Sequence, residues 1–570
     1  MDASSRQTSS QPTFAELFTP KLMTVLREGY DLHAFRADVV SGLTVAIVAL
    51  PLSMAIAIAS GTTPDRGLYS AIFGGFVVSL LGGSRFQIGG PAGAFIVLVA
   101  ASVTRHGIEG VLLATMIAGM ILIVAGYLQL GTYIKFIPYP VTVGFTAGIA
   151  VIIFASQIRD LLGITLTRKE PGELIPKLEL LGQAIGTTNA WAVAISAVTI
   201  AIIAGLRRIR PTWPGMLVAV VAASAIAAFL ELPVETIGTR FGGIPQSFPH
   251  PALPTITLVK IQEVLPDAAA FALLGAIESL LSAVVADGMS GRRHRSNSEL
   301  VAQGFANISS ALFGGICVTG TIARTATNVR AGARGPVSGM LHSLFLLAFM
   351  LLAAPLASYV PLATLAGVLA VVAWNMAEKH EFATLMRSSW GDAVVLLATF
   401  LLTVFRDLTE GILVGFALGA LLFIHRMSQT TGVESYAPLD DKADTTNGDR
   451  EPYDATLATD PDIMIYRITG AFFFGAVAAV ASVFDRLSGH KALVIDFAAV
   501  PFLDSTAAYT IAQIAIKARR HGIRVFITGA SASVRRTLLS HGARPPHARY
   551  RSDIASAVSE IKRLTADIAA

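Results

Sequence analysis

The sequence predicts an α-helical polytopic membrane protein with 14 membrane segments, arranged as two inverted repeats of seven, followed by a small soluble α/β domain. The first reason is composition: of 570 residues, 53% are hydrophobic and 14% are charged, whereas about a quarter of a typical soluble chain is charged. The second is a series of apolar runs of membrane-spanning length. The third is a pair of short segments after Gly/Pro punctuation, at corresponding places in two halves of the chain. This composition excludes a soluble multidomain enzyme.

Charge divides the chain into four parts. Residues 1–37 are polar, without the apolar run of a signal peptide, and are expected to stay in the cytoplasm. Residues 38–427 carry 23 basic and 19 acidic side chains and are the predicted membrane domain. Residues 428–452 are an expected acidic linker, because they offer no apolar face to bury. Residues 453–570 have 14 basic and 9 acidic residues, as in an ordinary soluble domain.

Several apolar runs are long enough to be spans, and five shorter runs together with two half-helices complete the count of 14. The longer runs are Val39–Ala59, Val111–Leu128, Val141–Phe154, Trp191–Leu206, Met216–Leu230, Ala268–Ala286 and Gly339–Leu356. The shorter ones lie near 68–81, 298–313, 362–373, 392–404 and 412–427. Alternating the loops places 13 basic residues, with few acidic ones, on one side. That side is predicted to be cytoplasmic, with both termini.

Two runs are too short to cross a bilayer and are predicted to be half-helices, Pro91–Val103 and Thr319–Val329. Gly90 lies 52 residues after Asp38, and Gly320 lies 53 residues after Asp267, at the openings of the first and eighth segments. An odd number of segments separates the halves, so the second is inverted. Broken helices in inverted repeats are typical of secondary transporters rather than of receptors or membrane enzymes.

The N-termini of the half-helices predict an anion site, because both present free N–H groups and the positive end of a dipole. One side would consist of Gly90, Pro91, Ala92 and Gly93, with Pro91 in the first helical turn. The other would contain Gly320 and the permanent charge of Arg324. Alternatively, Arg324 bridges two helices or reaches the membrane surface.

Glu278 lies inside an otherwise apolar span, where burial favours a protonated carboxyl group that could couple transport to protons. The alternative is a static ion pair with Arg324. Ser53 and Ser279 occupy similar places in the two repeats and could bind a ligand, although Ser53 is expected to bond its own helix.

Other features favour plain structural roles. The spacings Gly144 to Gly148 and Gly415 to Gly419 indicate helix packing. The cluster at 292–295 could bind anionic lipid headgroups, but a topology anchor is preferred. Basic residues scattered among apolar runs argue against nucleic acid binding. The lone Cys317 excludes an intrachain disulfide, and no motif for an enzyme, cofactor or metal is present.

The soluble part alternates strand and helix patterns, which predicts a small α/β sandwich. The expected strands are Ile463–Ile468, Ala492–Phe497 and Arg524–Thr528, and the expected helices are Ala476–Leu487, Thr506–Ala518, Ser533–Ser540 and Ile554–Leu564. Asp504 is expected to cap the helix that follows it. A regulatory phosphorylation at Ser505 or Thr506 is the alternative role for this turn.

These residues together resemble the sulfate permease (SulP) family of anion transporters, bacterial relatives of prestin and pendrin. The similarity lies in the run from Asp38 to Thr44, in ALPLSMA at 49–55, PDRGLY at 64–69, Gly90-Pro91, IES at 277–279, ADGM at 286–289, IART at 322–325 and NVRAG at 328–332. The sequence FLDST at 502–506 resembles the STAS domain that these transporters share with anti-sigma-factor antagonists.

The resemblance implies a core and a gate domain, elevator-like movement of the core, a homodimer and cytoplasmic STAS domains that could bind a protein partner. It places the anion site on Leu52, Ile56, Ala92, Ile322, Ala323 and Arg324, and proton coupling on Glu278. Leu52 departs from a polar residue of animal members, and Cys317-Val318 departs from a Pro-containing approach. Both departures put chloride-like selectivity in doubt.

Within the family, 278–287 and 372–376 look most like proton-coupled bacterial members that take C4-dicarboxylates. Sulfate and bicarbonate stay open, in a bacterial inner membrane. A sodium-coupled carrier would be expected to gather extra carboxylate or hydroxyl ligands around the site, which weakens this alternative. It is not excluded, because Thr319 and Thr321 could serve as ligands. An anion exchanger, a nucleobase carrier and a STAS-based regulatory platform are the further alternatives.

Overall fold

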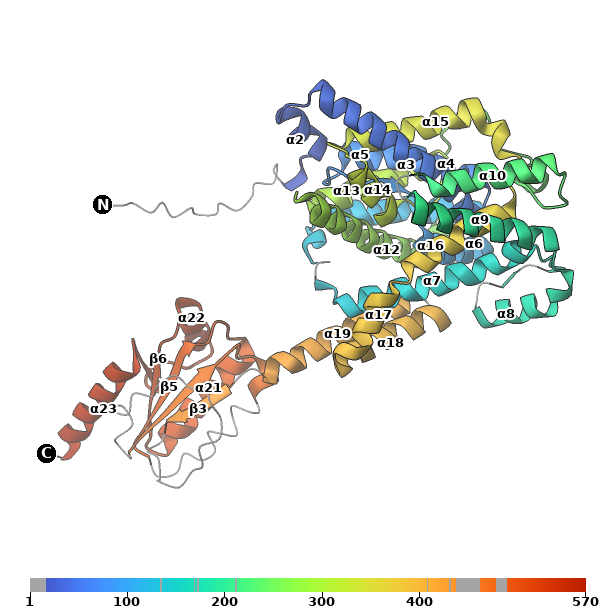
Figure 1. Ribbon diagram of the computed structural model, residues 1–570. Helices are drawn as coiled ribbons and strands as arrows, with labels where there is room; N and C mark the ends of the chain where they lie inside the picture. Colours follow the sequence, from blue (N-terminus) through green and yellow to red (C-terminus); the bar gives the residue numbers. More distant parts are fainter. Residues whose placement is uncertain are drawn as a thin grey trace. The chain divides into compact units, whose positions relative to one another are not determined.

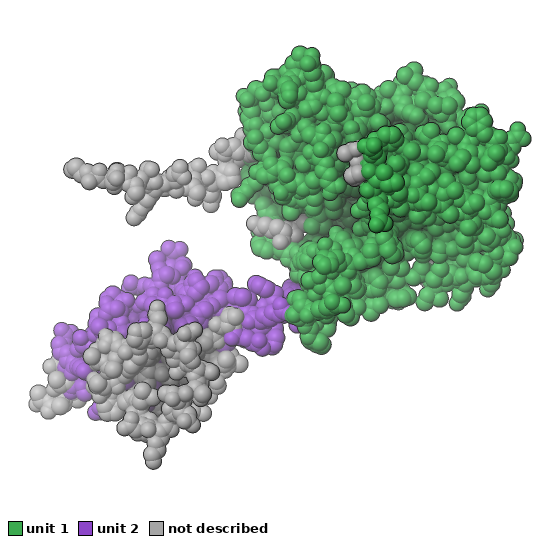
Figure 2. Space-filling view, in the orientation of Figure 1, with its two compact units in different colours: residues 1–416 green, residues 417–570 purple. Residues whose placement is uncertain are grey.

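The computed structural model describes residues 17–133, 136–168, 170–171, 174–210, 213–406, 408–429, 432–436, 462–477 and 490–569. It divides into two compact units, Met1–Phe416 and Ala417–Ala570 (Figure 2). Most of the expected acidic linker, and all but the start of the expected helix Ala476–Leu487, lie outside the described residues.

Within the described residues, eight helices are long and apolar enough to cross a membrane, and Figure 1 labels most of them. They are α3 (Leu32–Ala59), α6 (Ile96–Tyr127) with the 3-10 turn η2 (Gly93–Phe95) before it, α7 (Tyr139–Leu162), α9 (Ala190–Ile209), α12 (Leu258–Ser290), α15 (Val337–Ala357), α16 (Leu362–Met376) continuing into α17 (Lys379–Ser388), and α19 (Leu408–Gln429). Two shorter apolar helices are α10 (Gly215–Phe229) and α18 (Trp390–Phe405). The polytopic helical fold is confirmed, whereas the count of 14 segments stays a prediction.

The remaining helices of the first unit include α13 (Ser296–Leu312), which packs on α6, and α14 (Ile322–Arg330), which carries Arg324. The others are α2 (Lys21–Arg27), α4 (Pro64–Tyr69), the π-helical η1 (Ser70–Gly74), α5 (Gly75–Leu81), η3 (Leu130–Thr132), α8 (Leu174–Gln183), η5 (Ile185–Thr187) and α11 (Ile237–Phe241).

Small residues bring the long helices into close contact. α6 packs on α12 and α13, α3 on α15, and α7 on α16 and α18. A Cβ atom at Gly144 would lie 2.5 Å from the Leu396 carbonyl oxygen, and one at Gly148 would lie 2.6 Å from Thr403. Gly415 faces Thr399 in the same way. The predicted packing role is confirmed at Gly144, Gly148 and Gly415, and it stays a prediction at Gly419.

Two interrupted segments meet in the middle of this helical unit. The strands β1 (Gly89–Gly90) and β2 (Thr319–Gly320) pair antiparallel, and each leads into a helix. Gly107, with a φ of 66°, breaks α6 into a short first part and a longer second part that ends at Tyr127. The prediction that the helices start at Pro91 and Thr319 is wrong, because both strands and the residues after them are extended. The helices start at Gly93 and Ile322.

The second unit is an α/β sandwich with a five-stranded sheet in the order β3-β4-β5-β6-β7. β3 (Gly432–Tyr436) runs antiparallel to β4 (Ile463–Thr469), and β4, β5 (Ala492–Ala499), β6 (Arg524–Thr528) and β7 (Ala548–Arg551) are parallel. α21 (Ser505–Arg520) and α22 (Ala532–Ser540) pack in one apolar cluster, and α23 (Ile554–Ala569) packs in another. The predicted sandwich is confirmed, and β3 falls in the range expected to be linker.

Candidate functional site

The start of each half-helix is fixed by the paired strands. Gly89 pairs with Gly320, and Gly90 pairs with Thr319. The helices begin after Ala92 and Thr321, whose backbones are extended and whose side chains make no capping hydrogen bond. Leading N–H groups without a side-chain cap, together with the dipole, give each helix start a positive potential. The strand pair holds the two starts side by side, which suits an anionic ligand.

Arg324 supplies the charge of this site from the first turn of α14. Its side chain is buried at 1% exposure, and its Nη2 donates to the Ser53 hydroxyl at 3.1 Å and to the Pro91 carbonyl at 3.3 Å. Its Nε and Nη1 have no partner within the described chain. A buried guanidinium with two free nitrogens is strongly unfavourable unless an anion joins it. Arg324 therefore lies inside the protein, where it also joins α14 to α3 through Ser53.

Pro91 has a different place from the one predicted. It precedes the helix, and its carbonyl group accepts a hydrogen bond from Arg324. Its ring is therefore useful for fixing the extended backbone between β1 and the helix rather than for opening the first helical turn. Gly93 opens the 3-10 turn in its stead.

The α3 residues predicted to line the site lie on a buried stretch of that helix. Leu52 and Ile56 are buried at 7% and 2% exposure. The Ser53 hydroxyl donates to the Ala49 carbonyl at 2.7 Å and accepts from Arg324. It thus makes the expected bond to its own helix and still contacts the candidate site.

The residues next to Arg324 differ in exposure. Ala92 is buried, Ile322 is half-buried and Ala323 is exposed. The start of α14 therefore carries an accessible small residue beside a fully buried charge.

Glu278 is buried in α12 at 6% exposure. Among the described residues, no ion pair joins Glu278 to Arg324, and no hydrogen bond to the carboxyl group is present. The static pair weighed as an alternative is therefore absent in this conformation. The residue after it, Ser279, accepts a hydrogen bond from Gln87 Nε2 at 2.8 Å. One turn further, Ser282 donates to Thr325 at 3.0 Å, which ties α12 to α14.

Sequence reasoning missed the polar residues that hold the loop before β1. Glu299 of α13 accepts from the Gly83 and Ser84 N–H groups at 2.8 and 3.0 Å. Asn328 of α14 donates to the Phe86 carbonyl at 2.9 Å, and Thr325 accepts from the Ile88 N–H at 3.1 Å. Spacing offered one signal: Glu299, Gln303 and Asn307 recur every four residues and so share one face of a helix.

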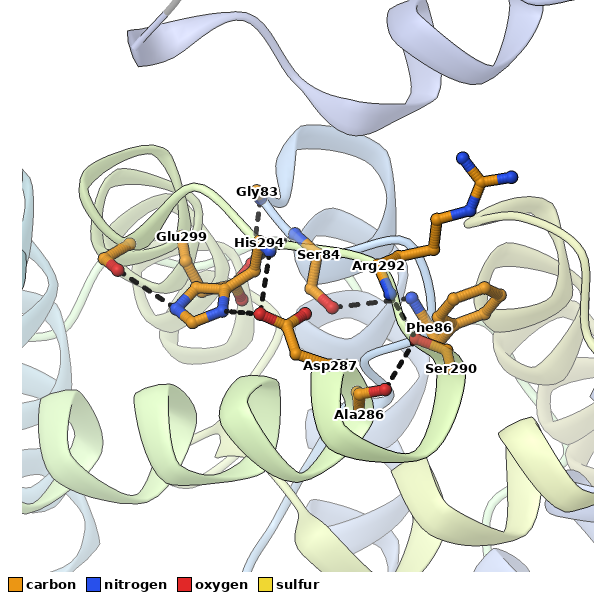
Figure 3. A network of polar contacts seen from close by, with 10 residues as sticks. Gly83, Ser84, Phe86, Ala286, Asp287, Ser290, Arg292, His294 and Glu299 are labelled. Atoms are coloured by element: carbon orange, nitrogen blue, oxygen red, sulfur yellow. Dashed lines mark hydrogen bonds and ion pairs between the residues drawn. The ribbon is translucent and has the colours of Figure 1, made fainter. Parts of the chain in front are cut away.

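The turn between α12 and α13 is closed by a second set of polar contacts (Figure 3). Asp287 accepts from the His294 backbone at 3.0 Å, and its carboxylate lies 2.7 Å from the His294 ring. Arg295 donates to the Thr19 carbonyl and the Thr24 hydroxyl, at 2.8 and 2.9 Å. Arg292 and Arg293 are exposed. One arginine of the cluster at 292–295, predicted to be a topology anchor, is therefore engaged by the N-terminal segment.

In the second unit, Asp504 caps α21 as predicted, by accepting from the Ala507 N–H at 2.8 Å. Its other oxygen accepts from the Phe474 N–H at 2.9 Å. Ser505 and Thr506 are exposed in the first turn. A phosphorylation there stays a prediction.

This arrangement, with two broken helices that meet start to start among membrane spans, defines a secondary membrane transporter. Residues 35–399 match the sulfate permease family, and residues 454–545 match the STAS domain. The chain belongs to the sulfate permease family of anion transporters and carries a C-terminal STAS domain.

Named relatives are transporters, which supports a role other than an enzyme's. The chain is 39% identical to a putative sulfate transporter of Bacillus subtilis, YvdB, over 90% of this chain and 95% of the relative. It is 32% identical to the bicarbonate transporter BicA of a Picosynechococcus species, over 88% and 90% of the two chains.

Solved structures agree on the fold. The transmembrane domain of a cyanobacterial bicarbonate transporter BicA has a TM-score of 0.62 and 32% identity, and covers 67% of this chain and 98% of its own. Murine Slc26a9, an anion transporter in the inward-facing state, has a TM-score of 0.83 at 18% identity, over 98% and 97% of the chains. The second likeness concerns the fold alone.

Proposed function

We propose that this protein is a secondary active anion transporter that couples sulfate, C4-dicarboxylate or bicarbonate movement to protons by an elevator-like motion of its core. The observation that carries the proposal is Arg324, buried between two uncapped helix starts with Nε and Nη1 unpartnered in the described chain. A small anion would satisfy these nitrogens and the leading N–H groups together. The binding residues would be Leu52, Ser53, Ile56, the segment 90–93, Gly320, Ile322, Ala323 and Arg324.

Glu278 is the proposed coupling residue. Its carboxyl group is buried in a membrane helix without a cation paired to it in the described chain. An unpaired buried carboxylate is costly, so the neutral acid is favoured until the site opens to water. Binding and release of that proton would accompany the anion through the cycle.

Relatives named as sulfate and bicarbonate transporters support an inorganic anion, and a site made of backbone N–H groups and one guanidinium reads charge more than identity. A sodium-coupled bicarbonate symporter and an anion exchanger are the alternatives. For sodium coupling, Thr319 and Thr321 would be the candidate ligands, and their hydroxyls donate to the Gly275 and Ile88 carbonyls, at 3.0 and 3.3 Å. A nucleobase carrier usually binds the base with carboxylates, so the positive charge of Arg324 argues against that function.

The proposal also includes the setting of the chain. It would lie in a bacterial inner membrane as a homodimer, with both termini in the cytoplasm and the membrane domain at 38–427. The STAS domain, proposed as 453–570, would bind a cytoplasmic partner, regulated through the exposed Ser505 or Thr506.

The test is uptake of labelled succinate, sulfate and bicarbonate into proteoliposomes, with and without an inward proton gradient, for the wild type and Glu278→Gln. We expect one anion to accumulate only with the gradient and the variant to lose accumulation. Sodium replaces the proton gradient in a second arm. Uptake that needs no gradient and survives the substitution would contradict proton coupling and indicate an exchanger or a uniporter.

A further inference from the structure

One glycine in each strand of the pair lies beneath a long polar side chain from the other half of the chain. A Cβ atom at Gly90 would lie 2.0 Å from Nη1 of Arg324. A Cβ atom at Gly320 would lie 1.6 Å from Nε2 of Gln87. Arg324 thus crosses the first strand, and Gln87 crosses the second. The two side chains occupy equivalent places at the paired helix starts.

Gln87 connects this strand pair to the helix of the proposed coupling residue. It lies just before β1 and is buried at 3% exposure. Its Nε2 donates to Ser279 Oγ at 2.8 Å, and Ser279 follows Glu278 in α12. An amide-to-hydroxyl network of this kind is rigid only while every link is present.

The connection continues from Ser279 into α13. Ser279 Oγ lies 3.5 Å from Glu299 Oε1, which also accepts from Gln303 Nε2 at 3.2 Å. The second oxygen of Glu299 accepts from the Gly83 and Ser84 N–H groups. The loop 83–90 is therefore bonded to α13 through Gly83 and Ser84, and to α12, the helix of Glu278, through Gln87.

One polar atom of Gln87 takes no part in the hydrogen-bond network described above. Its Oε1 is buried without a hydrogen-bond partner within the described residues. A group present only to stabilise the fold would be expected to satisfy both ends of its amide, because a buried acceptor without a donor is destabilising. Arg324, which lies over the opposite strand, likewise has two buried nitrogens without a partner in the described residues. Each side chain is thus hydrogen-bonded through one nitrogen and leaves another buried polar atom without a partner in the described residues.

We propose that Gln87 is a positioning residue for coupling: through Ser279 it holds the segment of α12 that carries Glu278 in register with the first half-helix. The proposal rests on the proposed function, since it assigns Gln87 a role in that transport. Gln87 donates to Ser279, whereas the Arg324 guanidinium that would bind the anion donates to Ser53 and Pro91. Its loss therefore uncouples transport from the proton gradient without weakening anion binding.

The experiment compares full-length wild type, Gln87→Met, Ser279→Ala and the double variant in proteoliposomes. Methionine keeps the length and volume of the side chain and removes the amide. Two quantities are measured: the KM of gradient-independent anion exchange, and accumulation driven by an inward proton gradient. Gln157→Met is the matched control, since Gln157 of α7 is an equally buried amide that bonds its neighbour Ser156.

We expect Gln87→Met and Ser279→Ala each to lower accumulation by about fivefold or more, with the exchange KM within about twofold of wild type. The double variant should lose no more than the single variants, because both remove the same bond. Gln157→Met should accumulate like wild type. Normal accumulation by Gln87→Met, a parallel rise in its KM, or losses that multiply in the double variant would each overturn the proposal.

The same experiment distinguishes a failure of the proposed proton-coupled transport from a failure of the role proposed for Gln87. If wild type accumulates no anion under a proton gradient, the proposed coupling fails before any variant is compared, and the role of Gln87 in coupling fails with it. If wild type accumulates and only the Gln87 and Ser279 results disagree, the transport function stands and this inference alone is wrong.

Discussion

The Arg324 guanidinium can lie against the first strand because position 90 has no side chain. Its Nη1 occupies the space that a Cβ atom would need, and Nη2 reaches the Pro91 carbonyl beyond it. Glycine is required at position 90 because another side chain approaches the backbone closely, and not because the backbone needs a conformation that only glycine adopts. The charge of the site and the small residue beneath it therefore form one feature.

We expect Gly90→Ala to lower anion uptake by about tenfold or more, equivalent to at least about 1.4 kcal/mol. The new methyl group would displace the guanidinium from Ser53 and Pro91 and misdirect its free nitrogens. Initial uptake rates in proteoliposomes measure the effect. Gly288→Ala is the control, because no heavy atom lies within 4 Å of a Cβ atom there. Equal uptake by both variants would contradict this account of Gly90.

Residues such as Arg324 and Glu278 could be selected from sequence because a charge inside an apolar run is conspicuous. Gln87 could not, and the spacing around Glu299 indicates only a polar helix face, since the roles of both residues depend on Ser279 and on the Gly83 and Ser84 backbone. These partners are distant in sequence, and only the folded chain brings them together. Pro91 was misplaced for a related reason: the strand pair that keeps its backbone extended joins two halves of the chain.

Among the elements, α3 is anchored at its start by a buried carboxylate that joins three segments. Asp38 accepts from the Tyr30 hydroxyl at 2.6 Å and from the Arg334 and Gly335 N–H groups at 2.6 and 3.2 Å. It thereby attaches the loop that follows α14 to the first long helix. The position of the second half-helix depends on that attachment.

Asp38→Ala should lower the apparent Tm in detergent more than Asp31→Ala does. The first substitution leaves three donors without an acceptor, each worth about 1 to 3 kcal/mol where buried. The second removes an exposed N-cap bond to Ala34, worth about 1 kcal/mol. Thermal unfolding followed by tryptophan fluorescence compares them. A larger loss from Asp31→Ala would refute the anchoring role of Asp38.

The contact between β7 and α23 predicts a dependence of stability on pH. Arg551, and then Arg549 at 3.0 Å, hold the pKa of the Glu560 carboxyl below its usual value of 4.5. A carboxyl group whose pKa is lower in the folded state than in the unfolded state stabilises the fold at pH values above its usual pKa. That stabilisation is lost as the pH falls through the lowered pKa. Glu560→Gln should therefore destabilise the second unit near neutral pH and have little effect in strong acid. Urea unfolding of the two proteins at both pH values tests this, and a difference that grows in acid would contradict it.

Elements with a clear hydrophobic periodicity were predicted well, whereas short elements were not. The predicted Arg524–Thr528 and β6 coincide, and α22 differs from its predicted range by one residue at its start. β7 was missed because it has four residues, most of them polar, at the edge of the sheet. β3 was missed because charge alone marked its surroundings as linker.

For the whole molecule, the order of a membrane domain and a soluble sandwich follows from composition. The number of membrane crossings does not, because apolar runs and helices do not begin and end at the same residues. Gly107 breaks the backbone of α6 in the polar stretch between the predicted runs Pro91–Val103 and Val111–Leu128, and α16 continues toward α17 past the apolar run. Hydropathy counts apolar length, whereas crossings depend on backbone breaks that packing imposes.

The two units have separate hydrophobic cores, so removal of one should leave the other folded. The large apolar cluster of the first unit includes Leu52, Ile56 and Ile277, whereas the clusters of the second contain residues from 463 onward. The candidate site and all its contacts belong to the first unit. Binding of the anion should therefore not require the sandwich.

We expect a chain that ends after Gln429, which keeps α19 whole, to retain anion uptake within about tenfold of wild type and an unchanged KM. Arg324→Ala in the full-length chain should lose uptake although the sandwich is intact. Uptake by both proteins in proteoliposomes, with size-exclusion chromatography as a check on folding, separates a transporter from a regulatory platform. If the truncated chain folded but transported nothing, while Arg324→Ala transported normally, function would belong to the STAS domain and the anion site would be vestigial.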